Sequence, residues 1–303
     1  MKAITFTFAL LTSLPFYAFA DKPSEGEPHQ AVATSTPALL CADQADNRIR
    51  LINPLAANDN SATLWCYPAE SAKPLNYRPT DAKRVEFEGE VFVLAAYHGR
   101  VQLVRFRDHQ LVKDFSTYSS CHSAELLPDG AIVTVNSNHA MLRLHRSADE
   151  YVDLELPYAH GVTWDKTRQC LWVLGDCLYR FDYTEANLSL KSKFTLPGTP
   201  TGHDLFPLRE EAKLLVSNND ALFLFDITTE EFETVSELRM IKSASQHADG
   251  SIWVSDPKDI EGSPDWQSDA VISVFPKGAA KRYTIEGARF YKARWWQPVN
   301  FSY

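Results

Sequence analysis

A unit of two short strands recurs about every 40 residues along this chain and limits the folds that it can adopt. In one copy, residues 120–136, two apolar strands flank the turn Pro128-Asp129-Gly130, which is a hairpin signal. Aligned copies open at six positions, separated by 39, 38, 43, 39 and 50 residues: Lys83, His122, His160, His203, Lys242 and Lys292. A period near 40 residues with about four strands per unit is typical of a β-propeller.

The two ends of the chain complement each other. Residues 39–52 predict the second and third strands of a blade, and residues 62–66 predict its fourth, but no inner strand precedes them. Residues 290–296 supply one inner strand without partners. The sequence therefore predicts an all-β, six-bladed β-propeller over residues 38–303, closed by pairing of the C-terminal strand with the N-terminal blade.

The N-terminus predicts export. Residues 1–20 read as a signal peptide, with Lys2, an apolar run and the cleavage site Ala18-Phe19-Ala20. Residues 21–37 predict a disordered leader because they are rich in Pro, Ser, Glu, Thr and Ala and lack an apolar period. We therefore expect a periplasmic or secreted protein.

Net charge and hydropathy limit the classes of partner that we expect this protein to bind. Removing the signal peptide removes Lys2 and no acid, so the net charge changes from −9 to −10. That balance disfavours nucleic acid and anionic membrane surfaces. No later stretch is long and apolar enough for membrane insertion.

The cysteines predict little cross-linking. Five remain after cleavage, an odd number without metal-type CxxC spacing: Cys41, Cys66, Cys121, Cys170 and Cys177. At most Cys41 and Cys66, which fall in one blade, could pair. The others are expected to be small buried residues.

Propeller geometry predicts where a site would lie. Each inner strand begins at one face, near the central axis, so the six aligned residues should surround the mouth of the channel. The loops between second and third strands return to the same face. They add a second set of candidate ligand-binding residues: Asp43, His98, Asn138, Asp176, Asn219 and Asp256.

A structural role for each aligned residue is the competing interpretation. Inner strands often open with a polar residue that hydrates the channel or bonds a neighbouring loop. Three lysines side by side, Lys83, Lys242 and Lys292, would however repel one another unless an anion or acidic residues offset them. A bound anion is the compensation that we expect.

Two chemistries remain open for the mouth. In one, His122, His160 and His203 bind a divalent metal cofactor and leave positions open for substrate. In the other, the lysines hold a carboxylate or phosphate while a histidine or Tyr291 transfers a proton.

No nucleophile elbow, zinc-protease motif, phosphate loop or dinucleotide fingerprint is present. Trp266, in a polar insertion, could stack on a sugar.

The segments 121–130, 159–165, 202–205 and 291–296 resemble an uncharacterised bacterial family of exported six-bladed β-propellers, over nearly the whole mature chain. That resemblance implies the fold and no function. A histidine cluster at a propeller axis is also distantly similar to propeller-type polysaccharide lyases, where a metal ion engages the acidic sugar. Those have a seventh blade and a different histidine arrangement, so their residues are not transferred.

The expected function is that of an exported propeller that engages a small anionic ligand, with an acidic, uronate-containing sugar as the favoured class. Turnover by a lyase-like or hydrolytic reaction stays open. The alternative is a non-catalytic ligand-binding or protein-interaction scaffold, which would need only the rim loops.

Overall fold

The computed structural model describes residues 37–56, 62–184, 186–258, 260–278 and 280–302. The predicted signal peptide and all but the last residue of the predicted leader fall on residues 1–36, outside the described part. Six four-stranded antiparallel sheets make up the described chain, with one 3-10 helix at Ser137–His139. The predicted all-β, six-bladed propeller is confirmed.

The blades are numbered from the N-terminus, and their strands are given from the inside outward. Blade 1 contains β24 (Phe290–Trp295), β1 (Leu39–Asp43), β2 (Arg48–Ile52) and β3 (Thr63–Tyr67). Blade 2 contains β4 (Pro79–Phe87), β5 (Glu90–Tyr97), β6 (Arg100–Arg105) and β7 (Leu111–Ser116). Blade 3 contains β8 (Cys121–Leu126), β9 (Ile132–Asn136), β10 (Met141–His145) and β11 (Tyr151–Glu155).

The remaining three blades follow the same order. Blade 4 contains β12 (Gly161–Asp165), β13 (Cys170–Leu174), β14 (Cys177–Thr184) and β15 (Asn187–Thr195). Blade 5 contains β16 (Gly202–Pro207), β17 (Lys213–Asn218), β18 (Leu222–Asp226) and β19 (Glu231–Ser236). Blade 6 contains β20 (Ala244–Gln246), β21 (Ile252–Ser255), β22 (Ala270–Phe275) and β23 (Arg282–Thr284).

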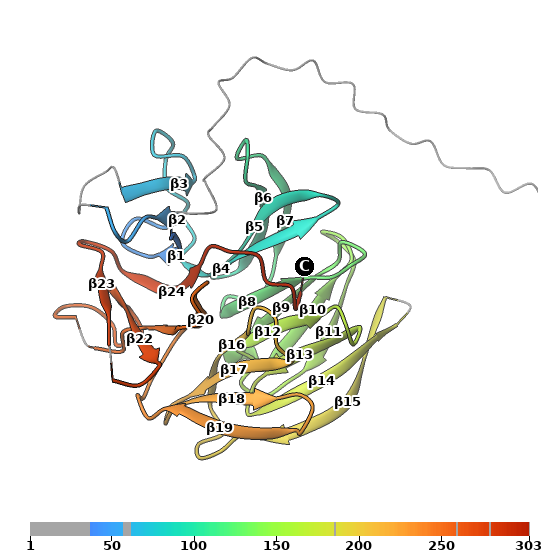
Figure 1. The fold of residues 1–303 in the computed structure, drawn as a ribbon. Helices are drawn as coiled ribbons and strands as arrows, with labels where there is room; N and C mark the ends of the chain where they lie inside the picture. Colours follow the sequence, from blue (N-terminus) through green and yellow to red (C-terminus); the bar gives the residue numbers. More distant parts are fainter. Residues whose placement is uncertain (1–36, 57–61, 185, 259, 279, 303) are drawn as a thin grey trace, which may run out of the picture. The chain divides into compact units, whose positions relative to one another are not determined.

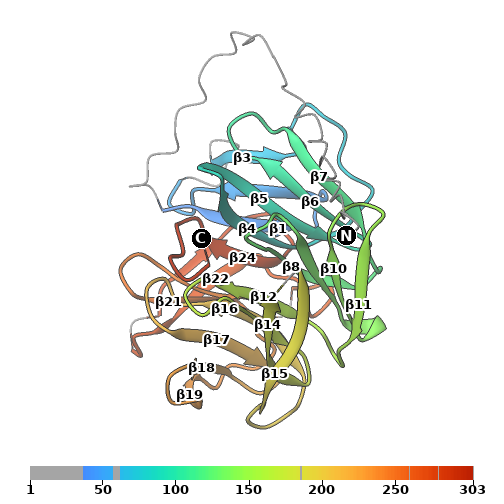
Figure 2. The ribbon, with the colours of Figure 1, turned by 90° about the vertical axis from the view of Figure 1, so that its right-hand side faces the viewer.

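The inner strands form a closed ring. Each contacts the inner strand of the next blade, in the order β24, β4, β8, β12, β16, β20 and back to β24. Their labels gather in the middle of Figure 1, whereas outer strands such as β3, β15, β19 and β23 lie at the periphery. In the side view of Figure 2, strands β5 to β7 and strands β14 and β15 lie on opposite sides of the inner strands.

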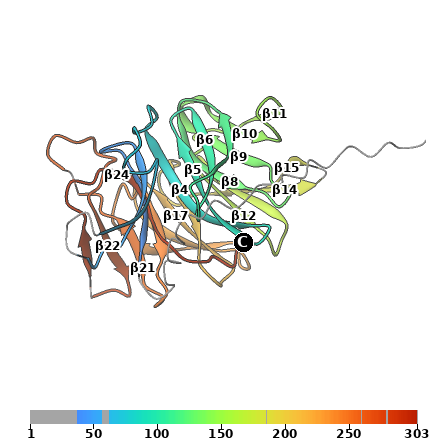
Figure 3. The same cartoon turned by 90° about the horizontal axis from the view of Figure 1, so that it is seen from above.

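The first blade is closed as predicted. β24 pairs antiparallel with β1, with Leu39 opposite Trp295 and Cys41 opposite Ala293. Figure 1 shows β24 next to β1, and in the view of Figure 3 the strand β24 lies beside the blue N-terminal part of the chain. Because the inner strand of this blade comes from the other end of the chain, no sheet edge is left open where the ring begins and ends.

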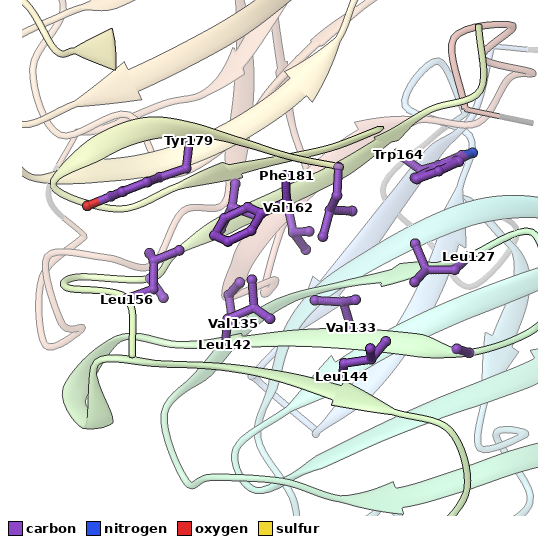
Figure 4. Close-up of a cluster of buried hydrophobic side chains, with 14 of the residues drawn as sticks. Leu127, Val133, Val135, Leu142, Leu144, Leu156, Val162, Trp164, Tyr179 and Phe181 are labelled. Atoms are coloured by element: carbon purple, nitrogen blue, oxygen red, sulfur yellow. The ribbon is translucent and has the colours of Figure 1, made fainter. Parts of the chain in front are cut away.

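Hydrophobic side chains fill the spaces between blades. Figure 4 shows one such cluster, in which Val135 and Leu142 of blade 3 face Val162 and Phe181 of blade 4. Both faces of the inner strands are covered, so β12 and β13 are buried throughout. Burial on both faces explains the continuous apolar run Cys-Leu-Trp-Val-Leu of β13.

The C-terminal tail, residues 296–302, leaves blade 1 and ends against blade 4. Ser302 Oγ donates a hydrogen bond to the carbonyl oxygen of Trp164 at 2.9 Å, and Lys166 N–H donates to the carbonyl oxygen of Phe301 at 3.0 Å. Val299 and Ser302 line a small space together with Lys83 and other residues far along the inner strands. The tail thus covers the end of the channel that lies away from the mouth.

The cysteines are buried, as expected, and the one pair that the sequence left open does not form. All five cysteines are free and buried, so Cys41 and Cys66 form no disulfide although both lie in blade 1. Cys41 lies in β1 and Cys66 in β3, with β2 between them. Among the described residues, no helix has the length and apolarity needed to cross a membrane.

Candidate functional site

Backbone irregularities at the start of the inner strands aim side chains at the mouth. In blades 2, 3 and 5 the pairing skips one residue, which is Thr80, His122 or His203. In blade 1, Tyr291 and Lys292 together lie opposite the single residue Ala42. Such β-bulges leave an extra residue outside the regular alternation and redirect its side chain.

These bulges correct the predicted alignment. The residues equivalent to the three histidines are Thr80 in blade 2 and Tyr291 in blade 1, so the alignment was wrong by three residues for Lys83 and by one for Lys292. The residues at the equivalent position form what we call the mouth layer: Thr80, His122, His160, His203, Lys242 and Tyr291.

Glycines beside two of the histidines let blades 4 and 5 approach closely. A Cβ atom on Gly161, next to His160, would lie 2.6 Å from Leu205 Cβ. One on Gly202, next to His203, would lie 2.7 Å from the carbonyl oxygen of Gly175. Because neither glycine could take a side chain without displacing the neighbouring blade, their role here is close packing.

The three histidines form a chain of rings. The centroids of His122 and His160 are 4.4 Å apart, and those of His160 and His203 are 5.6 Å apart. His122 Nδ1 lies 2.9 Å from Tyr291 Oη. His160 Nδ1–H donates to the carbonyl oxygen of Tyr158 at 2.7 Å, which leaves Nε2 of His160 as the unprotonated nitrogen.

Lys242 completes the layer beside His203. Its Nζ lies 3.2 Å from Nε2 and 3.5 Å from Nδ1 of His203, whose Nε2–H donates to Asn219 Oδ1 at 2.5 Å. Only 8% of Lys242 is exposed. Within the described part of the chain, Lys242 makes no salt bridge.

A balanced ionic network fills the channel beneath the mouth layer. Arg294, from β24, donates to both carboxylates of the pair Asp81 and Asp204, with distances of 2.8 to 3.2 Å. Lys292 Nζ lies 2.9 Å from Asp204 Oδ1 and 3.8 Å from Asp81 Oδ2. Two cations and two carboxylates therefore neutralise one another at nearly complete burial.

Lys83 is also paired. Its Nζ lies 2.9 Å from Glu125 Oε2 and donates to the carbonyl oxygen of Val162 at 2.6 Å. Two of the three predicted lysines, Lys83 and Lys292, thus have acidic partners within the protein. The repulsion among three lysines was our reason to expect a bound anion. For Lys83 and Lys292, carboxylates of the protein already offset that repulsion. Of the three lysines, only Lys242 has no carboxylate partner among the described residues and could still attract an anion at the mouth.

Burial sets the protonation of the mouth layer. Desolvation, helped by the charges of Lys292 and other cations, lowers the pKa of His122 to about 3. Desolvation and Lys242 lower the pKa of His203 to about 4, and desolvation and the neighbouring histidines hold the pKa of His160 well below its usual value. Desolvation lowers the pKa of Lys242 to about 8. At pH 7 the imidazoles are neutral and Lys242 is mostly charged.

This arrangement limits acid–base chemistry at the mouth. Burial and nearby carboxylates raise the pKa of Tyr291, so its phenol keeps its proton. A general acid or base works best with a pKa near the operating pH, and neither Tyr291 nor His122 meets that condition. Lys242 is the member of the layer whose pKa lies nearest to neutrality.

The histidines were also candidates for a divalent metal. Among the described residues, no group of three His, Cys, Asp or Glu side chains has the arrangement of a metal site. Nε2 of His203 contacts Asn219 and Nδ1 of His203 contacts Lys242, so neither nitrogen is free to bind a metal. Nε2 of His160, by contrast, is unprotonated and could bind one. Asp204 and Glu125, which are near these histidines in sequence, bind Lys292, Arg294 and Lys83 instead.

The loop residues divide into two groups. Asn219 contacts the mouth layer directly, and the charge of His98 contributes to the low pKa of His122. The other four, which the sequence placed on this face, make hydrogen bonds or ion pairs with residues outside the mouth layer. Asp43 accepts hydrogen bonds from Ala45 N–H and Arg289 N–H, Asn138 N–H donates to Ser120 Oγ, Asp176 accepts from Tyr179 Oη, and Asp256 pairs with Arg282.

Sequence reasoning missed several residues of the site. Tyr158 lies over His160 and His203, with ring centroids 4.4 and 6.4 Å away. Asp265, in the insertion of blade 6, is close enough to offset part of the lowering of the Lys242 pKa. The adjacent Trp266, which the sequence did suggest as a candidate, is 37% exposed. Their loops follow no repeat pattern. The 40-residue period could have pointed to Thr80, had the bulge been allowed for.

Low pH should destabilise the fold, because His122, His160 and His203 take up protons more readily in the unfolded chain. Their pKa values are lower in the folded protein than in the unfolded chain, so the unfolded chain binds more protons between about pH 6.5 and 4. The free energy of unfolding should therefore fall as the pH drops through that range. For His203, a shift from 6.5 to about 4 corresponds to about 3 kcal/mol. Denaturant unfolding at several pH values measures it.

The variant His203→Gln is the control for that experiment. Glutamine cannot take up a proton, so its stability should depend less steeply on pH than that of the wild type. Wild-type stability that stays constant from pH 6.5 to 4 would contradict buried, neutral histidines.

Residues 28–303 match the sequence model of a family described as a family of unknown function, DUF6528. The chain belongs to the DUF6528 family. This match agrees with the resemblance to an uncharacterised propeller family. Among curated proteins, none matches the DUF6528 chain in sequence.

Solved structures resemble the DUF6528 chain in fold. A protein of unknown function from Bacteroides caccae has a TM-score of 0.56 at 13% identity, over 86% of this chain and 99% of that one. A chain of a nidogen/laminin complex has a TM-score of 0.62 at 11% identity, over 88% and 100%. A functionally unknown protein from Desulfotomaculum acetoxidans has a TM-score of 0.58 at 11% identity, over 87% and 86%.

Proposed function

We propose that this protein is an exported, periplasmic or secreted propeller that binds a small anionic ligand at the mouth layer. The observation that supports it most is Lys242. This side chain is charged at pH 7, nearly buried, in contact with the neutral imidazole of His203, and without a salt bridge among the described residues. A desolvated cation binds a carboxylate or phosphate more strongly than an exposed one, because water screens it less.

An acidic sugar is the ligand class that suits the surroundings of Lys242. Tyr158 supplies aromatic surface beside the mouth histidines, and Trp266 is an exposed ring next to Asp265, whose charge acts on Lys242. Asn219 and the unprotonated nitrogen of His160 supply polar groups for hydroxyls. Small-molecule sites commonly combine such aromatic surface with a few directed polar groups. A uronate would place its carboxylate at Lys242 and its ring against the aromatic side chains.

The test is calorimetric titration of the full chain with galacturonate, sulfate and phosphate. Lys242→Ala should weaken binding at least tenfold, since a hydrogen bond to a charged group contributes about 1.5 to 3 kcal/mol. The matched control is Lys191→Ala, which removes an exposed lysine from the outer strand of blade 4 and should leave binding unchanged. Binding should also weaken with salt.

The pH dependence of binding has a definite sign. Lys242 must carry its proton to attract an anion, and its pKa is about 8. Affinity for sulfate, whose charge is constant over this range, should therefore fall as the pH rises from 7 to 9. Affinity that does not depend on Lys242, salt or pH, or no binding of any acidic sugar or inorganic anion, would contradict the proposal and favour the protein-interaction scaffold.

Two further measurements on the same samples address metal and turnover. Stoichiometric metal in the wild type that is lost in His160→Ala would assign the histidines to a metal and move catalysis ahead of simple binding. Incubation with oligogalacturonate, followed by absorbance of an unsaturated product and by reducing ends, separates lyase-like from hydrolytic turnover. Because His122 and Tyr291 have pKa values far from neutrality, we expect binding without rapid turnover.

A further inference from the structure

A second recess adjoins the mouth layer. It has a volume of about 430 Å³ and is formed by loops of blades 1 and 2. The residues that line it are all polar or amphipathic: Gln44, Asn47, Asn76, Tyr77, Arg78 and His98. A recess of this volume lies within the range of small-ligand sites, about 300 to 1,000 Å³.

Three observations place this recess beside the mouth layer. Arg78 precedes β4, whose second residue is Thr80 of the mouth layer. Gln44 Nε2 donates a hydrogen bond to the carbonyl oxygen of Pro79 at 2.8 Å. His98 lies close enough to His122 that a proton on His98 lowers the pKa of His122. A ligand longer than one unit could therefore extend from the mouth layer into the recess.

The recess offers an available cation. Arg78 is exposed, and it makes no salt bridge among the residues that the structure describes. Its charge, after desolvation, lowers the pKa of His98, so the imidazole is neutral and can hydrogen-bond a hydroxyl. A guanidinium can hold a carboxylate with two parallel hydrogen bonds, which a lysine cannot do.

The recess also has a fixed aromatic ring. Arg100 lies 5.2 Å from the centroid of the Tyr77 ring, and its Nη1 donates to Tyr77 Oη at 3.3 Å. Arg100 is itself held by both carboxylate oxygens of Asp114. Because Arg100 orients Tyr77 and 36% of the tyrosine stays exposed, its ring can stack on a ligand without first being ordered.

We propose that this recess is a second subsite, so that the ligand is an oligomer of at least two acidic sugar units. One carboxylate lies at Lys242 and the next at Arg78, with Asn47, Asn76 and His98 available to hydroxyl groups. This inference rests on the proposed function, because it assumes that the first unit binds at the mouth layer. It specifies oligomers of acidic sugars as the ligand class, a preference that Lys242 alone would not produce.

The experiment compares ligand lengths in the full chain. Galacturonate, digalacturonate and trigalacturonate are titrated into the wild type, Arg78→Ala, Arg78→Lys and Lys242→Ala. In the wild type we expect the dimer to bind at least tenfold more tightly than the monomer. Arg78→Ala should remove that gain and leave monomer affinity within twofold of the wild type. Arg78→Lys should restore only part of it.

Controls separate this inference from the proposed function. Arg107→Ala removes an exposed arginine from the loop between β6 and β7 and should bind all three ligands as the wild type does. If monomer and dimer bind the wild type equally, or the gain persists in Arg78→Ala, the subsite is overturned, whereas weaker binding in Lys242→Ala still supports the mouth site. If none of the three ligands binds, both proposals fail.

Discussion

Removing residues 288–303 is expected to abolish cooperative folding, the largest effect that we predict. The truncation deletes β24, which pairs with the whole of β1 and supplies Arg294 and Lys292 to the channel. Without them, blade 1 loses its inner strand and the ring opens between blades 6 and 1. Circular dichroism during thermal unfolding should show a broad transition, or none, in place of a sharp one.

A shorter truncation is the control. Removing residues 298–303 deletes the tail contacts of Phe301 and Ser302 but leaves β24 complete. That variant should unfold cooperatively at a lower temperature, because it loses a buried phenylalanine and a few hydrogen bonds. A protein truncated before residue 288 whose melting matched the wild type would contradict closure of the ring through β24.

Arg294→Met is expected to destabilise the fold by about 3 to 5 kcal/mol, the usual cost of removing one partner from a buried ionic network. Arg294 is 2% exposed, and its guanidinium bonds both Asp81 and Asp204. The substitution leaves two buried carboxylates near one remaining cation, Lys292. Denaturant unfolding at pH 7 gives the change in free energy.

A second substitution tests whether charge is the reason. In Arg294→Met the added change Asp81→Asn removes the excess carboxylate, so the double variant should be more stable than Arg294→Met alone. The two residues contact each other, and their effects should therefore not add. Arg107→Met, at an exposed position, is the matched control. A loss below 1 kcal/mol in Arg294→Met, or no recovery in the double variant, would contradict the network.

The balance of charge along the axis explains why so polar a channel is stable. Arg294 and Lys292 face Asp81 and Asp204, and Lys83 faces Glu125, so each of these six charges has an opposite partner. Their mutual attraction offsets the cost of removing them from water. Lys242 has no salt-bridge partner among the described residues, and for that reason the proposed ligand site depends on it.

The sequence alone determined the architecture of this protein. A 40-residue period predicted six blades, because each blade must contribute one unit of similar length to a ring. An N-terminal blade without an inner strand and a C-terminal strand without partners predicted closure, because unpaired strand edges are unfavourable. The same period brought His122, His160, His203 and Lys242 together correctly, since equivalent positions in adjacent blades meet at the axis.

Only the folded structure shows which of the charged side chains at the axis lack a partner of opposite charge. Bulges at Thr80 and Tyr291 changed the alignment in blades 2 and 1, and a bulge depends on local pairing that no periodicity reveals. The partners that neutralise Lys83 and Lys292 lie 42 and 88 residues away, on other blades. Ion pairing is a matter of distance in space, so the repeat could predict that cations meet at the axis but not which of them find carboxylates there.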